Sequence, residues 1–308
     1  MSAPEDLQTQ PSLAGAHRYD LCADDGTVLV AHVLRNPKAG RRLVVSHGNG
    51  MATPGYRVFW TALREHFEIV VFDMRGHGAS QAGPETLDPW GLFARDLQLL
   101  CDALLQEDRR PLVGCFHSLS AVTSLLHLPT CDTAPWHSLV LFDPPLTPPT
   151  GHALAPQHQM EMASLAAAAL RRPRTYASVQ DRARQFMRAE IFGHWAEGAP
   201  MDMARATLVP DPQAGWRLAC DPPREAAIFE TNHHVAVWDI LASPGCPVAL
   251  ISGDPRLQQA RCPALTSQLA HQRLGLPWQP IAGTGHFLQL EMPRECASAL
   301  RQFTQACH

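Results

Sequence analysis

The chain has 308 residues, of which 45% are hydrophobic and 18% are charged, and its formal net charge is −4. This balance is typical of a globular protein with a sizeable core, and it offers no extended basic surface for nucleic acid. The sequence shows neither a run of about 18 apolar residues that could span a membrane nor a signal-peptide pattern at its N-terminus. It therefore predicts a cytoplasmic protein with no nucleic-acid or membrane partner.

The cysteines and histidines do not indicate a metal or a cofactor. The nine cysteines are scattered and include no C-x-x-C pair, and the sixteen histidines show no H-E-x-x-H or comparable ligand spacing. We therefore expect no metal and no cofactor, and we expect most cysteines to be reduced and buried as small hydrophobic residues.

Short runs of β-branched and aliphatic residues predict strands over residues 27–34, 42–46, 68–73, 111–117, 138–143 and 247–252. Several runs, such as LVLF and IVVF, are continuously apolar rather than alternating. Strands buried on both faces have this pattern, which predicts an α/β fold with a mostly parallel sheet between helices. Amphipathic spacing predicts two covering helices, one over residues 89–105 and one that begins at Pro293.

The strand signal disappears between residues 146 and 235, where Ala, Arg, Met and Pro become frequent. We predict an inserted helical cap over residues 146–235 and an α/β core formed by residues 1–145 and 236–308. Apolar side chains of the insertion suggest an apolar pocket, although at helical spacing they are also typical of a core. These side chains are Met160, Met162, Phe186, Met187, Ile191, Phe192 and Trp195.

The segment PLVGCFHSLSAVTSL passes from a predicted strand into a helix-forming stretch at Ser118. A sharp strand-to-helix turn of this kind exposes the hydroxyl of a nucleophilic serine. This sequence has Phe116 and Ser120 at the two positions where the usual G-x-S-x-G pattern has glycines. Small residues are favoured there so that strand and helix can pass closely, so the large Phe116 needs a compensating gap nearby. We expect Phe116 and His117 to contact the substrate. Ser120 as the nucleophile and a helix-capping role for Ser118 are alternatives.

The glycine-rich turn at residues 47–50, HGNG, follows the strand RLVVS. Its bare backbone can approach a substrate closely. We expect the backbone N–H groups of Asn49 and Leu119 to stabilise the oxyanion that forms when Ser118 attacks a carbonyl. The next loop, FDMRGHGAS, is interpreted as structural, and His77 within it as non-catalytic.

The segment IAGTGHFLQLEMP places His286 in a loop after a short apolar strand. A histidine in such a loop can reach the serine in the strand-to-helix turn, Ser118, and act as its general base. Its place after the serine fits the chain order Ser, acid, His of many serine hydrolases.

The motifs HGNG, DMRGHGAS, FHSLSA and GTGHFLQLEMP, in this order, resemble the α/β-hydrolase superfamily over nearly the whole chain from about residue 19 to residue 303, apart from the inserted cap. The resemblance implies an eight-stranded, mostly parallel sheet, a helical cap and a Ser-acid-His triad. It also argues against dehalogenase and epoxide hydrolase activity, because members with those activities carry aspartate at the position of Ser118.

The resemblance leaves two candidates for the acid. Asp254 is the only carboxylate in the loop ISGDPRL, but it precedes by two positions the usual place of the acid, where Arg256 stands. Asp143, at the end of LVLFD, corresponds to the acid of other members, and its register favours it slightly. Whichever residue is the acid should be buried and should orient His286.

Together these residues predict hydrolysis of a carboxylic ester, lactone or thioester with a small or medium apolar acyl group, through an acyl-enzyme. Two other functions are compatible with the sequence. One is a carbon–carbon bond hydrolase or cofactor-free lyase on the same fold, and the other is a ligand-binding protein that has lost catalysis.

Overall fold

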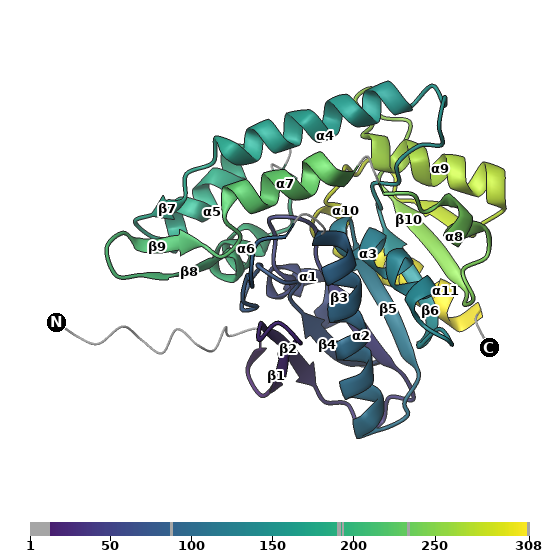
Figure 1. Cartoon of the computed structure of the whole chain (residues 1–308), viewed down its shortest axis with the longest axis horizontal. Coiled ribbons are helices and arrows are strands. Elements are labelled where there is room, and N and C mark those ends of the chain that lie inside the picture. The colour runs from purple at the N-terminus through teal and green to yellow at the C-terminus, as the bar shows by residue number, and fades with distance from the viewer. Residues whose placement is uncertain (1–12, 87–88, 190–191, 193, 233–234, 307–308) are drawn as a thin grey trace.

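The computed structural model describes residues 13–86, 89–189, 192, 194–232 and 235–306 (Figure 1). Its main sheet has eight strands in the order β1-β2-β4-β3-β5-β6-β10-β11. Their bounds are β1 His17–Cys22, β2 Val28–Leu34, β3 Arg42–Ser46, β4 Glu68–Phe72, β5 Leu112–His117, β6 Trp136–Phe142, β10 Val248–Ser252 and β11 Trp278–Pro280. β2 pairs antiparallel with β1 and β4, and every other pair is parallel. The predicted mostly parallel sheet is confirmed.

All of the strands predicted from apolar runs are present, and β3 has the predicted bounds. The two edge strands, β1 and β11, were not predicted, for different reasons. β1 is mostly exposed, so it lacks a continuous apolar run, and β11 has only three residues.

Alternate side chains of the central strands enter two separate cores. In β5, Leu112 and Phe116 enter one core, while Val113 and Cys115 enter the other. The first core is covered by α2 (Pro89–Glu107), α3 (Leu119–His127), α8 (Trp238–Ala242) and α9 (Cys262–Leu274). The second is covered by α1 (Arg57–Trp60), α10 (Leu288–Glu291) and α11 (Pro293–Ala306). Burial on both faces explains the continuously apolar strands.

The segment between β6 and α8 is not wholly helical, in contrast to the prediction. Besides α4 (Ala155–Leu170), α5 (Val179–Arg188), α6 (Ala199–Thr207) and α7 (Pro222–Asn232), it holds an antiparallel sheet of β7 (Thr175–Tyr176), β9 (Gly215–Leu218) and β8 (Leu208–Asp211). Strands of two to four residues are too short for a periodic sequence signal. In Figure 1, α4 and α7 pack side by side across the upper end of the main sheet.

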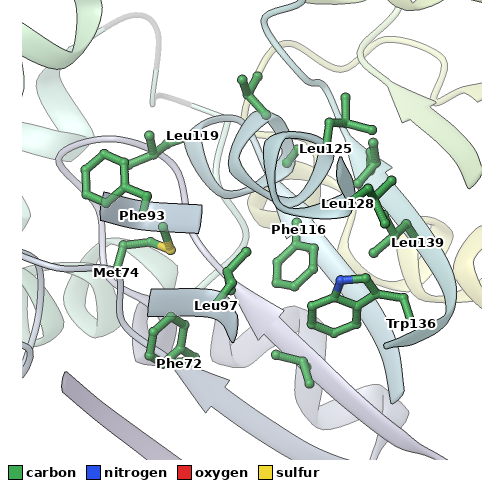
Figure 2. Close-up of a cluster of buried hydrophobic side chains, with 14 of the residues drawn as sticks. Phe72, Met74, Phe93, Leu97, Phe116, Leu119, Leu125, Leu128, Trp136 and Leu139 are labelled. Carbon is green, nitrogen blue, oxygen red and sulfur yellow. The ribbon is translucent and has the colours of Figure 1, made fainter. Parts of the chain in front are cut away.

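The predicted contact between Phe116 and a substrate is wrong, because this side chain lies in the core on the α2 and α3 side. Its ring is fully buried and packs edge-on against Trp136, with 5.2 Å between the ring centroids (Figure 2). The compensating gap is provided by Gly114, where an added Cβ would lie 2.5 Å from the Phe116 ring. The large residue therefore fits the strand without entering the turn at Ser118.

We predict that Gly114→Ala lowers the free energy of unfolding by about 1–3 kcal/mol, since the added methyl group overpacks the core against Phe116 and Leu139. Urea unfolding followed by circular dichroism measures this loss. Gly40→Ala is the control, because a Cβ at Gly40 meets nothing within 4 Å. Equal stability of Gly114→Ala and the wild type would contradict the packing described here.

Candidate functional site

Ser118 stands between β5 and α3 in a strained backbone conformation, with φ 53° and ψ −110°. Its N–H donates to the carbonyl of Phe142 at 3.0 Å, which ties the turn to β6. Its side chain makes no capping hydrogen bond to α3, so the helix-capping alternative is wrong. The Ser118 hydroxyl lies instead 3.1 Å from Nε2 of His286.

The other candidate nucleophile, Ser120, is enclosed in the turn. Its hydroxyl donates to the carbonyl of His117 and accepts the N–H of the same residue, both at 3.0 Å, and its side chain is fully buried. A hydroxyl with both roles occupied inside the protein cannot reach a substrate. Ser120 therefore stabilises the turn that presents Ser118.

His286 connects Ser118 to a buried carboxylate. Its Nδ1 lies 2.6 Å from Oδ2 of Asp143, whose other oxygen accepts the N–H of Gly253 at 3.0 Å. A histidine that donates its Nδ1–H to a carboxylate has the lone pair of Nε2 directed at the serine. The structure therefore brings Ser118, His286 and Asp143 together in one hydrogen-bonded chain.

Backbone strain is concentrated at both ends of this chain. Among the described residues, the non-glycine residues with positive φ are Ser118, at 53°, and Asp143, at 44°. Such conformations cost about 1–3 kcal/mol each and persist where the surrounding structure fixes them. At Asp143 this restraint includes an N–H donated to the carbonyl of Ile251 at 2.8 Å.

Asp254 does not contact His286. Its two carboxylate oxygens accept from the guanidinium of Arg256, each at 2.9 Å, and one of them also accepts the N–H of Gly283 at 3.0 Å. The hydrogen bonds from Arg256 hold the pKa of Asp254 well below its usual range. Because its own N–H donates to the carbonyl of Thr284 at 2.9 Å, Asp254 fastens the loop after β10 to the loop that precedes His286.

The two expected oxyanion donors border the pocket that contains Ser118. Leu119 is the first residue of α3, so its N–H has no acceptor within the helix. Within the described part of the chain, no hydrogen bond engages the backbone N–H of Leu119 or of Asn49. Both N–H groups therefore lack an acceptor among the described residues, as the expected role requires.

Two buried histidines hold the HGNG turn. His47 donates from Nδ1 to the carbonyl of Gly48 at 2.8 Å and accepts the N–H of Met74 at Nε2, at 3.0 Å. His77 accepts the N–H of Gly50 at 3.1 Å. Burial lowers the pKa of His47 to about 4 and the pKa of His77 well below its usual value, so both rings are neutral. This geometry gives His77 a structural role.

His117 borders the pocket, but its ring nitrogens are not available to a substrate. Its Nδ1 accepts the hydroxyl of Tyr56 at 2.8 Å, and its Nε2–H donates to the carbonyl of His286 at 2.9 Å. Burial holds the pKa of His117 well below its usual value, which keeps the ring neutral. His117 thus positions the backbone of His286. Tyr56 was not predicted, because no motif surrounds it and it lies 61 residues from His117 in the sequence.

Helices α4 and α7 supply much of the pocket wall, and Arg261 and Pro263 at the start of α9 also line it. The apolar lining residues are Met51, Trp90, Leu119, Pro145, Met162, Leu165, Ala168, Phe192, Ile228, Phe229, Pro263 and Phe287. The main polar side chains besides those of Ser118, His117 and His286 are Asn49, Glu161, Arg172, Glu225, Asn232 and Arg261.

The apolar residues predicted to form the pocket separate into three groups. Met162 and Phe192 line it, whereas Phe186 and Trp195 are buried in the second core. Met160 and Met187 are 67% and 56% exposed and contribute to neither, and Ile191 lies outside the described residues. Helical spacing alone did not distinguish these groups.

In the part of the chain that the structure describes, no group of three or more His, Cys, Asp and Glu side chains is arranged to hold a metal ion. The described cysteines are all free, which excludes disulfides among them. None of the described helices is both long and apolar enough to cross a lipid bilayer.

Residues 43–299 match the family model of the alpha/beta hydrolase family. The chain belongs to this family. A search of curated proteins finds no match.

The chain is also similar to solved structures, each of which it covers almost completely. E-2-(acetamidomethylene)succinate hydrolase is 20% identical, with a TM-score of 0.72 over 94% of this chain and 100% of that chain. The thioesterase domain from the curacin biosynthetic pathway is 19% identical, with a TM-score of 0.69 over 93% and 99%. An esterase from Rhodococcus sp. is 18% identical, with a TM-score of 0.69 over 94% and 99%. At these identities the likeness shows the fold.

The neutral state of His47 has a consequence for stability below pH 6.5. The folded protein does not protonate this ring until about pH 4, whereas the unfolded chain protonates it near 6.5, so its contribution is complete above pH 6.5 and is lost as the pH falls toward 4. The loss is about 1.4 kcal/mol per pH unit. Glutamine offers a similar donor and acceptor but does not titrate.

We therefore expect the stability difference between the wild type and His47→Gln to shrink by about 2 kcal/mol between pH 7.5 and pH 5. Urea unfolding of both proteins at the two pH values gives this double difference, in which the other titrating groups cancel. A difference that does not change with pH would mean that the folded protein binds a proton at His47 as readily as the unfolded chain does.

Proposed function

We propose that this protein is a serine hydrolase that cleaves a carboxylic ester or a related acyl bond, such as a lactone or thioester, through an acyl-enzyme at Ser118. The observation that carries the proposal is the hydrogen-bonded chain from Asp143 through His286 to Ser118, with links of 2.6 and 3.1 Å, at a largely apolar pocket. Membership of the alpha/beta hydrolase family supports it. So do the esterase and the thioesterase domain among the proteins of similar fold.

In the proposed reaction, Ser118 Oγ attacks the carbonyl carbon while Nε2 of His286 takes the hydroxyl proton. The buried carboxylate of Asp143 stabilises the imidazolium that forms. The negative charge that develops on the carbonyl oxygen is stabilised by the N–H groups of Asn49 and Leu119. His286 then protonates the departing alcohol or thiol, which leaves the acyl group on Ser118.

A water molecule then hydrolyses the acyl-enzyme, and His286 again acts first as the base and then as the acid. His286 takes a proton from a water molecule as the water attacks the acyl-enzyme, and then returns a proton to Ser118 as the carboxylic acid leaves. The reaction consumes one water molecule and needs no cofactor. The apolar wall of the pocket favours a small or medium apolar acyl group, held beneath α4 and α7 in the role of a cap.

We predict that Ser118→Ala abolishes the hydrolysis of p-nitrophenyl esters and that Asp143→Asn lowers kcat by about 10³–10⁴, because His286 loses its anionic partner. Asp254→Asn is the matched control, since its carboxylate pairs with Arg256 rather than with His286, and we expect a loss of less than about tenfold. Steady-state kinetics over an acyl chain-length series measures all three. A steep loss in Asp254→Asn but not in Asp143→Asn would refute the assignment of the acid.

Labelling by a fluorophosphonate probe separates the proposal from the other functions. A protein labelled at Ser118 that cleaves dicarbonyl substrates but no ester would be a carbon–carbon bond hydrolase. A folded wild type that is never labelled would contradict catalysis by Ser118.

A further inference from the structure

One arginine at the pocket of Ser118 has no side-chain partner among the residues that the structure describes. The guanidinium of Arg261 makes no hydrogen bond and no ion pair with any of the described residues. As a residue, Arg261 is half-buried and borders the same pocket as Ser118 and His286. Because a guanidinium stays charged at every pH at which the protein folds, withdrawing it partly from water without an anion is unfavourable.

The other charged side chains of the pocket are occupied. Arg172 pairs with the buried carboxylate of Glu225. Glu161 accepts the first backbone N–H of α9 at 3.1 Å and the amide of Gln157 at 2.8 Å. Arg172 and Glu225 neutralise each other, and the carboxylate of Glu161 is bound by neutral donors, so Arg261 is left without a direct ion pair among the described residues.

The backbone that carries Arg261 is fixed. The residue immediately precedes α9, and its carbonyl accepts the N–H of Ala264 at 3.1 Å. The same stretch continues into Pro263, which also lines the pocket. Arg261 therefore stands at a defined place on the wall of a pocket whose lining is largely apolar.

We propose that Arg261 binds a carboxylate at the far end of the acyl group, so that the preferred substrates are half-esters or half-thioesters of dicarboxylic acids. This inference rests on the proposed function, because it assumes that Ser118 attacks the other end of the same molecule. A planar guanidinium matches a carboxylate through two parallel hydrogen bonds. The largely apolar lining of the pocket suits the methylene chain that would join this carboxylate to the carbonyl attacked by Ser118.

The test compares mono-p-nitrophenyl glutarate and adipate with neutral p-nitrophenyl valerate. We expect the wild type to favour an anionic ester by at least about tenfold in kcat/KM, and we expect Arg261→Gln to lower this preference at least about tenfold. Arg261→Lys should restore part of it, since lysine supplies the charge without the planar fork. The optimum chain length reports the reach from Arg261 to Ser118.

Arg273→Gln is the matched control, because Arg273 is exposed in the last turn of α9, the helix that Arg261 precedes, and its loss changes the net charge equally. We expect this variant to keep the wild-type preference. A wild type that favours the neutral ester, or an Arg261→Gln variant that keeps the anionic preference, would overturn the proposal.

Calorimetric titration with glutarate distinguishes failure of this inference from failure of the proposed function, since binding does not depend on turnover. Glutarate binding that Arg261→Gln abolishes supports the carboxylate site even if no ester is hydrolysed. Turnover of neutral esters without any glutarate binding to the wild type would leave the hydrolase intact and refute the carboxylate site.

Discussion

The buried carboxylate of Asp143 is the constraint on which the geometry of the site depends. A carboxylate with no access to water must be compensated by donors, and here they are the N–H of Gly253 and the Nδ1 of His286, at 3.0 and 2.6 Å. These donors follow β10 and β11, while Asp143 follows β6, and the three strands are neighbours in the parallel part of the sheet. Because parallel strands end at one edge, a single ionic group can join three loops and fix where His286 lies.

A second network fixes His286 from its carbonyl side. The hydroxyl of Tyr56 accepts the N–H of Gly48 at 3.4 Å and donates to His117, which donates in turn to His286. The same network therefore restrains the HGNG turn, which holds Asn49, one of the two proposed oxyanion donors, and the loop that carries His286, the proposed base. Coupled hydrogen bonds of this kind fix a geometry more firmly than separate pairs. A neutral His117 ring suits this role, because a second proton on the ring would turn Nδ1 from an acceptor into a donor and break the hydrogen bond from Tyr56.

The sequence predicted the meeting of Ser118 and His286 because each follows a strand and stands in a recognisable turn. It did not select the acid, since Asp143 and Asp254 follow adjacent strands and reach the same edge of the sheet. The deciding features are the positive φ of Asp143 and the side-chain pairing of Asp254 with Arg256, and neither has a signature in a single sequence. The orientation of Phe116 was missed for a related reason. The chain leaves β5 in the sharp turn at Ser118, so residue spacing does not indicate which side chains next to the turn face a pocket.

The remaining pocket residues depend on long-range packing, and Glu225 shows how closely that packing is tied to the chemistry. Its backbone carbonyl accepts a hydrogen bond from the side-chain amide of Asn49 at 2.8 Å, and its buried carboxylate pairs with Arg172. The same carboxylate packs against the HGNG turn, because a Cβ added at Gly50 would lie only 2.5 Å from it. Replacing Arg172 while α7 stays in place would leave this buried carboxylate unpaired, at a cost of about 3–5 kcal/mol. The position of α7 and the shape of the HGNG turn are therefore set together. Since Arg172 is committed to that pairing, it is Arg261 whose charge remains to be matched by what enters the pocket.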